Sequence, residues 1–311
     1  MQHSMTLGLS RRFVRNAGAA KLLLLFIAGC VPAPRPIAPA PASVRTAPPP
    51  RPVRTVVPKI ELKGTPRQGV ALLGKAPADT QTLLLDGAPV YLAPDKRFII
   101  AFDRDAPPSA LLRATLADGA VSELPLAVGP GNWQIEKVNA PLLGGAKTSE
   151  EFQRRRADEL AQIADARGGR VPSDGWQQAF IWPVKARISG RFGAQRIYQG
   201  TPGSYHSGVD LAGGAGTVYV APADGVVVLA ADRPFTLEGN LLIIDHGMGL
   251  NSAFLHNTRL LVKIGDVVKQ GQPIGVIGAT GRASGPHLHW SMKWQAARID
   301  PETFVAAQPG R

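Results

Sequence analysis

The chain has 311 residues, of which 44% are hydrophobic and 19% charged, with a formal net charge of +12. This length predicts two folded domains with additional segments. Eight lysines and arginines lie before residue 59 with no acidic residue among them, so residues 59–311 carry only about +4. This distribution argues against a basic folded surface, and we expect no nucleic-acid partner. The single cysteine excludes an intramolecular disulfide and a zinc site built from several thiolates.

Residues 1–30 have the composition of an export signal. A basic stretch precedes the apolar run Leu22–Ala28, which is too short to cross a bilayer permanently but suits the core of a signal peptide. The segment Ile27–Cys30 resembles a bacterial lipobox, which implies cleavage before Cys30 and lipidation of its sulfur. An ordinary signal peptide with an incidental cysteine is the alternative. We expect an exported protein, anchored through Cys30 at the periplasmic face of an outer membrane, because no aspartate follows the cysteine.

Residues 31–58 form a proline-rich linker. They contain ten prolines and few apolar residues that a core could bury. At ~3 Å per residue, such a semi-extended segment spans on the order of 80 Å. It suits a spacer that holds a folded domain at a distance from a membrane anchor. A ligand segment for a proline-binding partner domain is the alternative.

Residues 59–130 predict a small β domain, similar to a sandwich. Its short apolar runs are separated by turn residues, and Asp86-Gly87 and Asp118-Gly119 have the composition of hairpin turns. The predicted strands cover 69–73, 82–85, 98–102 and 111–116. No residues in this domain have the spacing of a catalytic site, so its candidate roles are positioning, binding or inhibition.

Residues 131–175 predict a connector with one helix at about 149–167. Thr148 and Glu151 have the capping-box spacing, and Gly168-Gly169 ends the pattern. The apolar residues that fall near one face are Phe152, Leu160 and Ile163. The helix is either a packed connector between domains or a cover over a functional groove.

From residue 176 to 311 the pattern returns to strands and tight turns, as in 225–230, 241–244 and 274–278. The loop Gly213–Gly216 lacks the lysine and following helix of a phosphate-binding loop. Four of the six histidines in the chain lie in this region at positions that suit a metal site and its chemistry: His206, His256, His287 and His289. Imidazole and carboxylate are zinc ligands, and a catalytic zinc keeps three protein ligands and a water.

The spacing of these residues indicates that their side chains can point into one site. Residues two apart on a strand share a face, so His287 and His289 can point into one cleft while Leu288 faces the opposite layer. Gly208 and the apolar residues around Asp210 argue against a helix, and we expect a loop entering a strand, with a turn or bulge bringing His206 near Asp210. The alternative is that each histidine is a hydrogen-bonded structural residue.

From about residue 182 to 301 the sequence resembles the lysostaphin/LytM-type zinc metallopeptidases, which cut peptide bonds in peptidoglycan. The motifs that carry the resemblance are Trp182-Pro183, Ser189–Gly193, His206–Leu211, Ala221–Val227, Asp245–Gly247, Phe254–His256, Gly265–Val268 and Thr280–His289. The resemblance implies a mainly β protein whose C-terminal antiparallel sheet, a duplicated hybrid motif, carries a groove with zinc at its floor.

The resemblance also implies the roles of individual residues. His206, Asp210 and His289 would bind one Zn²⁺ per chain, and His256 and His287 would be the catalytic histidines. The sequence departs from the family where Phe254 replaces the usual tyrosine and Asn257 replaces a common leucine; neither change removes a zinc ligand. His246 is expected to be structural.

Two functions follow from this resemblance. The first is a membrane-anchored zinc metalloendopeptidase that hydrolyses the cross-linked stem peptides of peptidoglycan. The second is a non-enzymatic envelope protein that activates or recruits a cell-wall amidase. The complete ligand set favours the enzyme, because regulators of this fold have typically lost zinc ligands.

Overall fold

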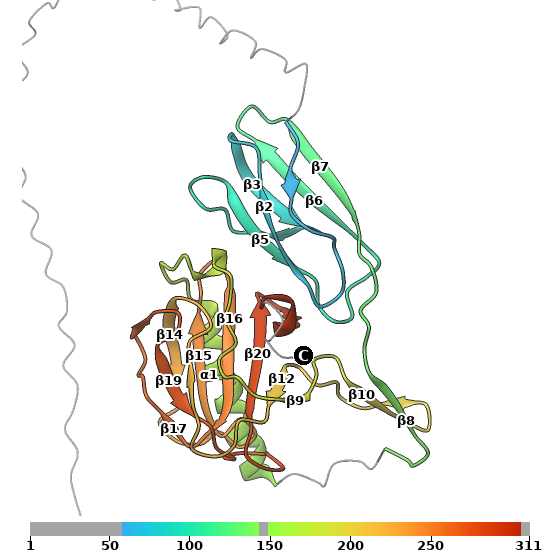
Figure 1. Ribbon diagram of the computed structural model, residues 1–311. Coiled ribbons are helices and arrows are strands. Elements are labelled where there is room, and N and C mark those ends of the chain that lie inside the picture. Colours follow the sequence, from blue (N-terminus) through green and yellow to red (C-terminus); the bar gives the residue numbers. More distant parts are fainter. Residues whose placement is uncertain (1–57, 143–148, 306–311) are drawn as a thin grey trace, which may run out of the picture. The chain divides into compact units, whose positions relative to one another are not determined.

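A computed structural model of the protein describes residues 58–142 and 149–305 (Figure 1). The described residues all belong to one compact unit. The predicted signal peptide, Cys30 and the proline-rich linker up to residue 57 lie outside the described residues. Within the described ranges, no helix has the length and apolar character needed to cross a bilayer.

The first β region is built from two small antiparallel sheets, with strand orders β1-β2-β5 and β4-β3-β6-β7. Large apolar side chains from both sheets, including Phe98, Ile100 and Leu112, are fully buried in the core. The strands are β1 (Glu61–Leu62), β2 (Ala71–Lys75), β3 (Thr80–Leu85), β4 (Ala88–Pro89), β5 (Arg97–Ala101), β6 (Ser109–Leu116) and β7 (Val121–Ala127).

Both expected hairpin turns are present. Asp86 and Gly87, with φ of 49° and 83°, join β3 to β4, as a type I′ turn requires. Gly119, with φ of 88°, lies in the turn between β6 and β7. The mainly β character predicted from the sequence is therefore confirmed in this region.

The predicted helix is α1 (Glu150–Gly168), and its predicted N-cap was wrong. The N-cap is Ser149, whose side chain accepts a hydrogen bond from the Phe152 amide; Thr148 lies outside the described residues. Leu160 is 49% exposed, and the buried residue of the helix is Glu159. Helical periodicity placed the apolar residues on one face, but it gave no sign that a carboxylate would face inward with partners of its own.

The second β region is dominated by an eight-stranded antiparallel sheet. Its order is β18-β14-β15-β16-β20-β12-β9, with β21 also paired to β20. A three-stranded sheet, β13-β19-β17, and a second, β11-β10-β8, complete the region; β8 pairs with β10 in parallel. The strands are β8 (Ile135–Val138), β9 (Ile188–Gly190), β10 (Gln195–Tyr198), β11 (Thr201–Pro202), β12 (Val209–Leu211), β13 (Val218–Val220), β14 (Gly225–Ala230), β15 (Asn240–Asp245), β16 (Leu250–Asn257), β17 (Arg259–Leu260), β18 (Val267–Val268), β19 (Pro273–Val276), β20 (Leu288–Trp294) and β21 (Ala297–Ile299), with short 3-10 turns at Gly175–Gln177 and Pro301–Thr303.

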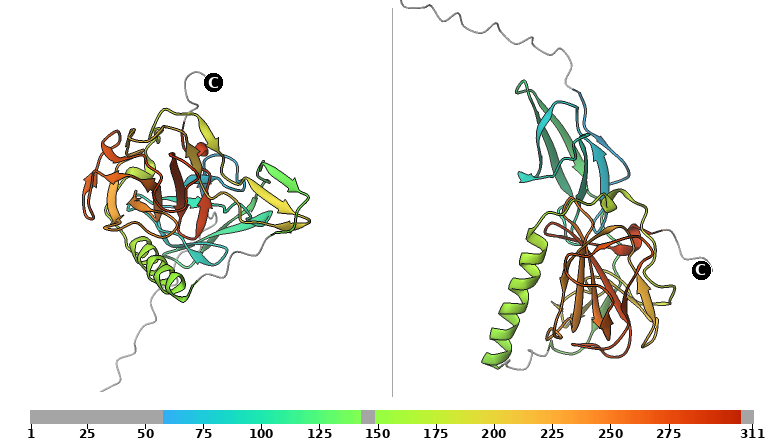
Figure 2. Two further views of the ribbon diagram at one scale, coloured as in Figure 1. Left: turned by 90° about the horizontal axis from the view of Figure 1, so that it is seen from below. Right: turned by 90° about the vertical axis from the view of Figure 1, so that its left-hand side faces the viewer.

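The two faces of the large sheet have different neighbours. Alternate residues of β20, namely Leu288, Trp290 and Met292, belong to the main core. Facing the other way, Leu241, Ile243 and Ala253 form a smaller apolar cluster that includes Ile163 and Ala166 of α1. Figure 2 shows the helix lying along this side of the sheet. The helix thus covers the face that also carries His289, since His289 and α1 residues line one cavity.

Candidate metal centre

The proposed metal ligands come from two paired strands and the loop before one of them. Asp210 in β12 is directly opposite His289 in β20, and β12 has an irregular register with β9 at Asp210. His206 lies in the loop that leads into β12. The predicted loop, strand entry and bulge are therefore present.

Two glycines make the close approach possible. A Cβ atom on Gly190 would lie 2.5 Å from Asp210 Oδ2, and one on Gly208 would lie 2.7 Å from His289 Nε2. Both separations are shorter than a real Cβ contact allows. A side chain at either position would therefore displace a candidate ligand.

The three candidate ligand atoms fit a single metal ion. His206 Nε2 lies 3.1 Å from both Asp210 Oδ1 and His289 Nδ1, and the last two atoms are 2.9 Å apart. Tetrahedral zinc with bonds of about 2.0 Å separates its ligand atoms by about 3.3 Å. The spacing of this donor set therefore matches the geometry of a zinc site, and these residues form a group that could hold a metal ion.

Hydrogen bonding and burial prepare the donors for a cation. His206 Nδ1 donates to the Arg191 carbonyl at 2.9 Å, which leaves the Nε2 lone pair directed at the centre. Burial opposes ionisation of Asp210, yet the adjacent His206 and His289 rings outweigh it and hold the pKa of that carboxyl well below its usual range. Burial lowers the pKa of His289, whereas at His206 the Asp210 carboxylate outweighs burial and raises the pKa. The group therefore offers one carboxylate and imidazole lone pairs, which are the forms that bind metals.

The two proposed catalytic histidines lie beside this group. The rings of His256 and His287 have centroids 4.9 Å apart, and His256 is 6.2 Å from the ring of His289. His287 Nε2 lies 3.5 Å from Asp210 Oδ1. All five residues singled out from the sequence thus meet in one place, although their division into ligands and catalytic groups stays a prediction.

Backbone carbonyls orient both of these histidines. Nδ1 of His256 donates to Thr280 O at 2.9 Å, and Nδ1 of His287 donates to Gly285 O at 2.8 Å. Each Nε2 atom is then the one left for proton exchange. Burial, with a smaller contribution from the neighbouring histidines, lowers the pKa of His256. Its φ of 66° is unusual for a non-glycine residue and marks a locally strained backbone at the centre.

His246 lies outside the ligand group and is completely buried. Its Nδ1 donates to Asp224 O at 2.7 Å, and its Nε2 accepts from Ser252 Oγ at 2.9 Å. Burial lowers the pKa of His246 to about 4. These contacts agree with the structural role predicted for it.

The two departures from the family pattern are both buried. Phe254 packs against Tyr219, with ring centroids 5.3 Å apart, and is completely inaccessible. Asn257 donates to the carbonyls of Asn240 and Phe254. Neither side chain is available to a substrate in this arrangement.

Two cavities adjoin the candidate ligands. One of about 940 Å³ is lined by His206, Asp210 and Arg282 together with the β8 and β10 residues Ile135 and Arg196. The other, of about 190 Å³, is lined by His289, by Ser207 and by α1. The contribution of β8 was not anticipated, because a parallel strand of four residues in a connector has no distinct sequence signal.

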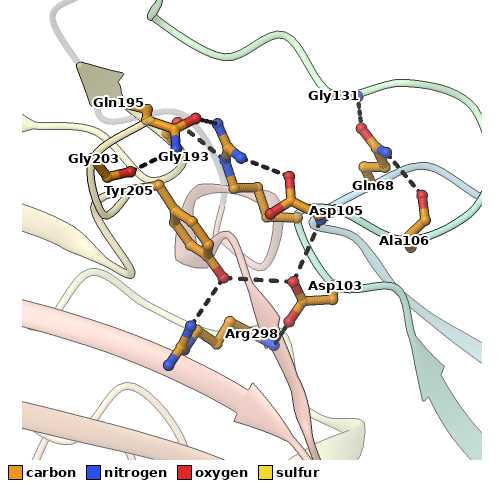
Figure 3. Close-up of polar contacts among 11 residues, drawn as sticks. Gln68, Asp103, Asp105, Ala106, Gly131, Gly193, Gln195, Gly203, Tyr205 and Arg298 are labelled. Carbon is orange, nitrogen blue, oxygen red and sulfur yellow. Dashed lines mark hydrogen bonds and ion pairs between the residues drawn. The ribbon is translucent and has the colours of Figure 1, made fainter. Parts of the chain in front are cut away.

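The first β region contacts Tyr205, which lies next to His206 in the chain (Figure 3). Tyr205, which precedes His206, accepts a hydrogen bond from Arg298 at 3.2 Å, and its hydroxyl lies 3.5 Å from Asp103 Oδ1. Asp103 Oδ2 accepts from the Arg298 amide at 2.8 Å. The Arg104 guanidinium lies 4.6 Å from the Tyr205 ring centroid. These contacts hold the loop that bears His206, which supports a positioning role for this region.

Comparison with known proteins agrees with this geometry. Residues 204–301 match the family model for peptidase family M23, so the chain carries an M23 peptidase domain, as the resemblance to LytM-type enzymes predicted. A crystal structure assigned to peptidase M23 from Pseudomonas aeruginosa has a TM-score of 0.61 and 27% identity, and the match covers 79% of this chain and 97% of that one. The mainly β fold is confirmed as typical of this family.

Three relatives are similar to parts of this chain, and their names differ. Peptidoglycan DD-endopeptidase ShyA of Vibrio cholerae is 41% identical over 38% of this chain and 28% of its own length. Uncharacterized lipoprotein YgeR of Escherichia coli is 29% identical over 57% of this chain and 68% of its own. Murein hydrolase activator NlpD of Escherichia coli is 34% identical over 40% of this chain and 30% of its own. The chain thus spans under a third of ShyA and NlpD.

Proposed function

We propose that the protein is a zinc metalloendopeptidase that hydrolyses peptide cross-links in peptidoglycan. The observation that carries this proposal is the complete donor set of His206, Asp210 and His289, with His256 and His287 beside it. The similarity to ShyA, which is named a peptidoglycan DD-endopeptidase, supports the substrate class.

The residues around the centre suit hydrolysis of a peptide bond. Zinc bound there would supply Lewis-acid activation of a water and of the substrate carbonyl. His256 and His287 each have Nδ1 committed to a backbone carbonyl, so their Nε2 atoms can take up a proton from the attacking water and deliver one to the leaving amine. The lowered pKa of His256 suits the role of a base, because its imidazole is neutral near pH 7.

We also propose that the enzyme is exported and anchored through a lipid on Cys30, at the periplasmic face of the outer membrane. The lipobox-like segment 27–30 and the proline-rich residues 31–58 support this placement. The relative YgeR is named a lipoprotein. The linker would let the domain reach the stem peptides at a distance from the membrane.

The second candidate function is activation or recruitment of a cell-wall amidase. It is favoured by the similarity to NlpD, which is named a murein hydrolase activator. The position of α1 on the sheet face beside His289 also suits a protein whose groove is occupied. The retained ligand set favours hydrolysis over this alternative.

Digestion of purified peptidoglycan sacculi distinguishes the two functions. Wild type, His289→Ala and a chelator-treated sample are compared after zinc per chain has been measured. We expect one zinc per wild-type chain and release of uncross-linked muropeptides by wild type alone. Equal inactivity of all three samples, with stimulation of an added amidase, would instead establish the activator.

A further inference from the structure

The smaller cavity beside His289 is strongly cationic. It lies between α1 and the large sheet, and its lining includes Arg156 and Arg167 from the helix, Lys293 from β20 and Arg298 from β21. Glu238 is the single acidic residue of this lining. Its charge is already paired, because Glu238 accepts two hydrogen bonds from Arg156 at 2.6 and 2.8 Å.

The other three cations lack such a partner. Among the described ion pairs, none includes Arg167, Lys293 or Arg298. The Arg298 guanidinium donates to the neutral Tyr205 hydroxyl. Arg167 Nε is buried without a hydrogen-bond partner. Arg167 and Lys293 are half-buried and Arg298 is exposed. Half-buried cations without a paired counter-charge are costly, so the pocket is arranged to favour an anion.

The electrostatics of the pocket agree with this geometry. Burial lowers the pKa of Arg167 to about 10, with a further contribution from Arg298. Burial and the charges of Arg167 and Arg298 lower the pKa of Lys293. The Tyr205 hydroxyl and Asp103, in contrast, raise the pKa of Arg298. A bound anion would therefore stabilise the charged forms of Arg167 and Lys293.

The pocket is continuous with the metal centre. His289, Ser291 and Lys293 alternate along β20 and line the same cavity as Ser207. Lys293 is four residues beyond the ligand His289 along the strand, which is roughly 13 Å between their Cα atoms. The cavity volume of about 190 Å³ has room for about six water molecules. It therefore accommodates a carboxylate at the end of a short chain, which can accept paired hydrogen bonds from arginine.

We propose that Arg167, Lys293 and Arg298 form a carboxylate-binding pocket that recognises an acidic group of the peptide substrate near the scissile bond. This inference rests on the proposed peptidase function and makes the enzyme selective for peptides with a free carboxylate. It also gives α1 a part in substrate recognition, since Arg167 belongs to the helix.

Binding to the full-length, zinc-free protein tests this proposal without requiring activity. The probes are a peptidoglycan stem tetrapeptide and the same peptide with every carboxylate amidated, measured by calorimetry. We expect the acid to bind about tenfold more tightly than the amide, in line with a hydrogen bond between charged groups. Lys293→Gln and Arg167→Gln should each remove most of this difference, whereas Lys293→Arg should retain it.

Lys263→Gln is the matched control, because Lys263 is an exposed lysine outside the pocket and its loss changes the net charge equally. Equal binding of acid and amide by wild type would overturn the proposal, as would unchanged discrimination in both glutamine variants. Binding of inorganic phosphate without peptide discrimination would likewise overturn it. If the protein binds the acid more tightly than the amide but digests no sacculus, the result supports the carboxylate pocket and refutes the hydrolase function.

Discussion

His206 Nε2 and His289 Nδ1 lie 3.1 Å apart although the residues are separated by 83 positions in the chain. The antiparallel pairing of β12 with β20 produces this proximity, because it sets Asp210 opposite His289 and brings the loop before β12 to the same edge. Two imidazole nitrogens so close, with a carboxylate oxygen in contact with both, are stable together when a cation lies between them.

Loss of one ligand should abolish zinc binding. In Asp210→Asn the neutral amide replaces a carboxylate, and we expect zinc affinity to fall by about 100-fold or more, since even indirect changes around a metal cost 10- to 100-fold. Elemental analysis after dialysis against a weak chelator measures the effect. His246→Gln provides the control, because His246 lies outside the ligand group and should leave zinc per chain unchanged. Full retention of zinc by Asp210→Asn would remove this residue from the site.

Loss of a catalytic histidine should affect turnover but not zinc. His256 and His287 each donate from Nδ1 to a backbone carbonyl, which leaves Nε2 for proton exchange, and neither belongs to the three-residue ligand group. We expect His256→Ala and His287→Ala to retain one zinc and to lose about 10²- to 10⁴-fold in activity, as is typical of general acid–base groups. Muropeptide release and metal content are measured on the same preparations. A loss of zinc in His287→Ala would instead show that this residue is a ligand.

Removal of the buried carboxylate of α1 should release the helix from the sheet. Glu159 accepts hydrogen bonds from the amide and hydroxyl of Thr236 and is paired with Arg155 and Arg156. We expect Glu159→Ala to cost about 3 kcal/mol, the typical effect of breaking a buried ion pair. Amide exchange in residues 150–168 should become faster. Sacculus digestion should become slower, because the released helix takes Arg167 away from the pocket beside His289.

Arg154→Ala is the matched control for this experiment. Its pair with Glu150 is highly exposed, with side chains 73% and 90% accessible, so the helix should remain docked. Faster digestion by Glu159→Ala, with a folded peptidase domain, would show that α1 covers the groove and takes no part in substrate recognition.

The buried His246 should make the protein sensitive to acid. Burial lowers its pKa from 6.5 to about 4, so the neutral form contributes stability that is complete above pH 6.5 and is lost as the pH falls through 4. The full contribution is about 3 kcal/mol. Urea unfolding of wild type and His246→Gln at pH 7 and pH 4.5 should show a smaller loss of stability in the variant. The comparison cancels the opposite contributions of Asp245 and Asp300, whose burial raises their pKa to about 6. Parallel stability curves for the two proteins would contradict this expectation.

Much of the fold could be predicted from the sequence because its signals are local. Alternation along β20, the turn at Asp86-Gly87 and the helix ended by Gly168-Gly169 each depend on a few neighbouring residues. The motifs around His206 and His289 identified the candidate ligands for the same reason, since each motif is short and contiguous.

The sequence by itself determined the main strands, the hairpin turns, the helix and which residue types could bind a metal. Only the tertiary structure decided which face of the sheet α1 covers, that Glu159 is its buried residue, and that β8 joins β10. It alone placed Arg167, Lys293 and Arg298 around one cavity. These relationships join residues that are distant in the chain, and their energies depend on burial and on facing charges, neither of which any local pattern encodes.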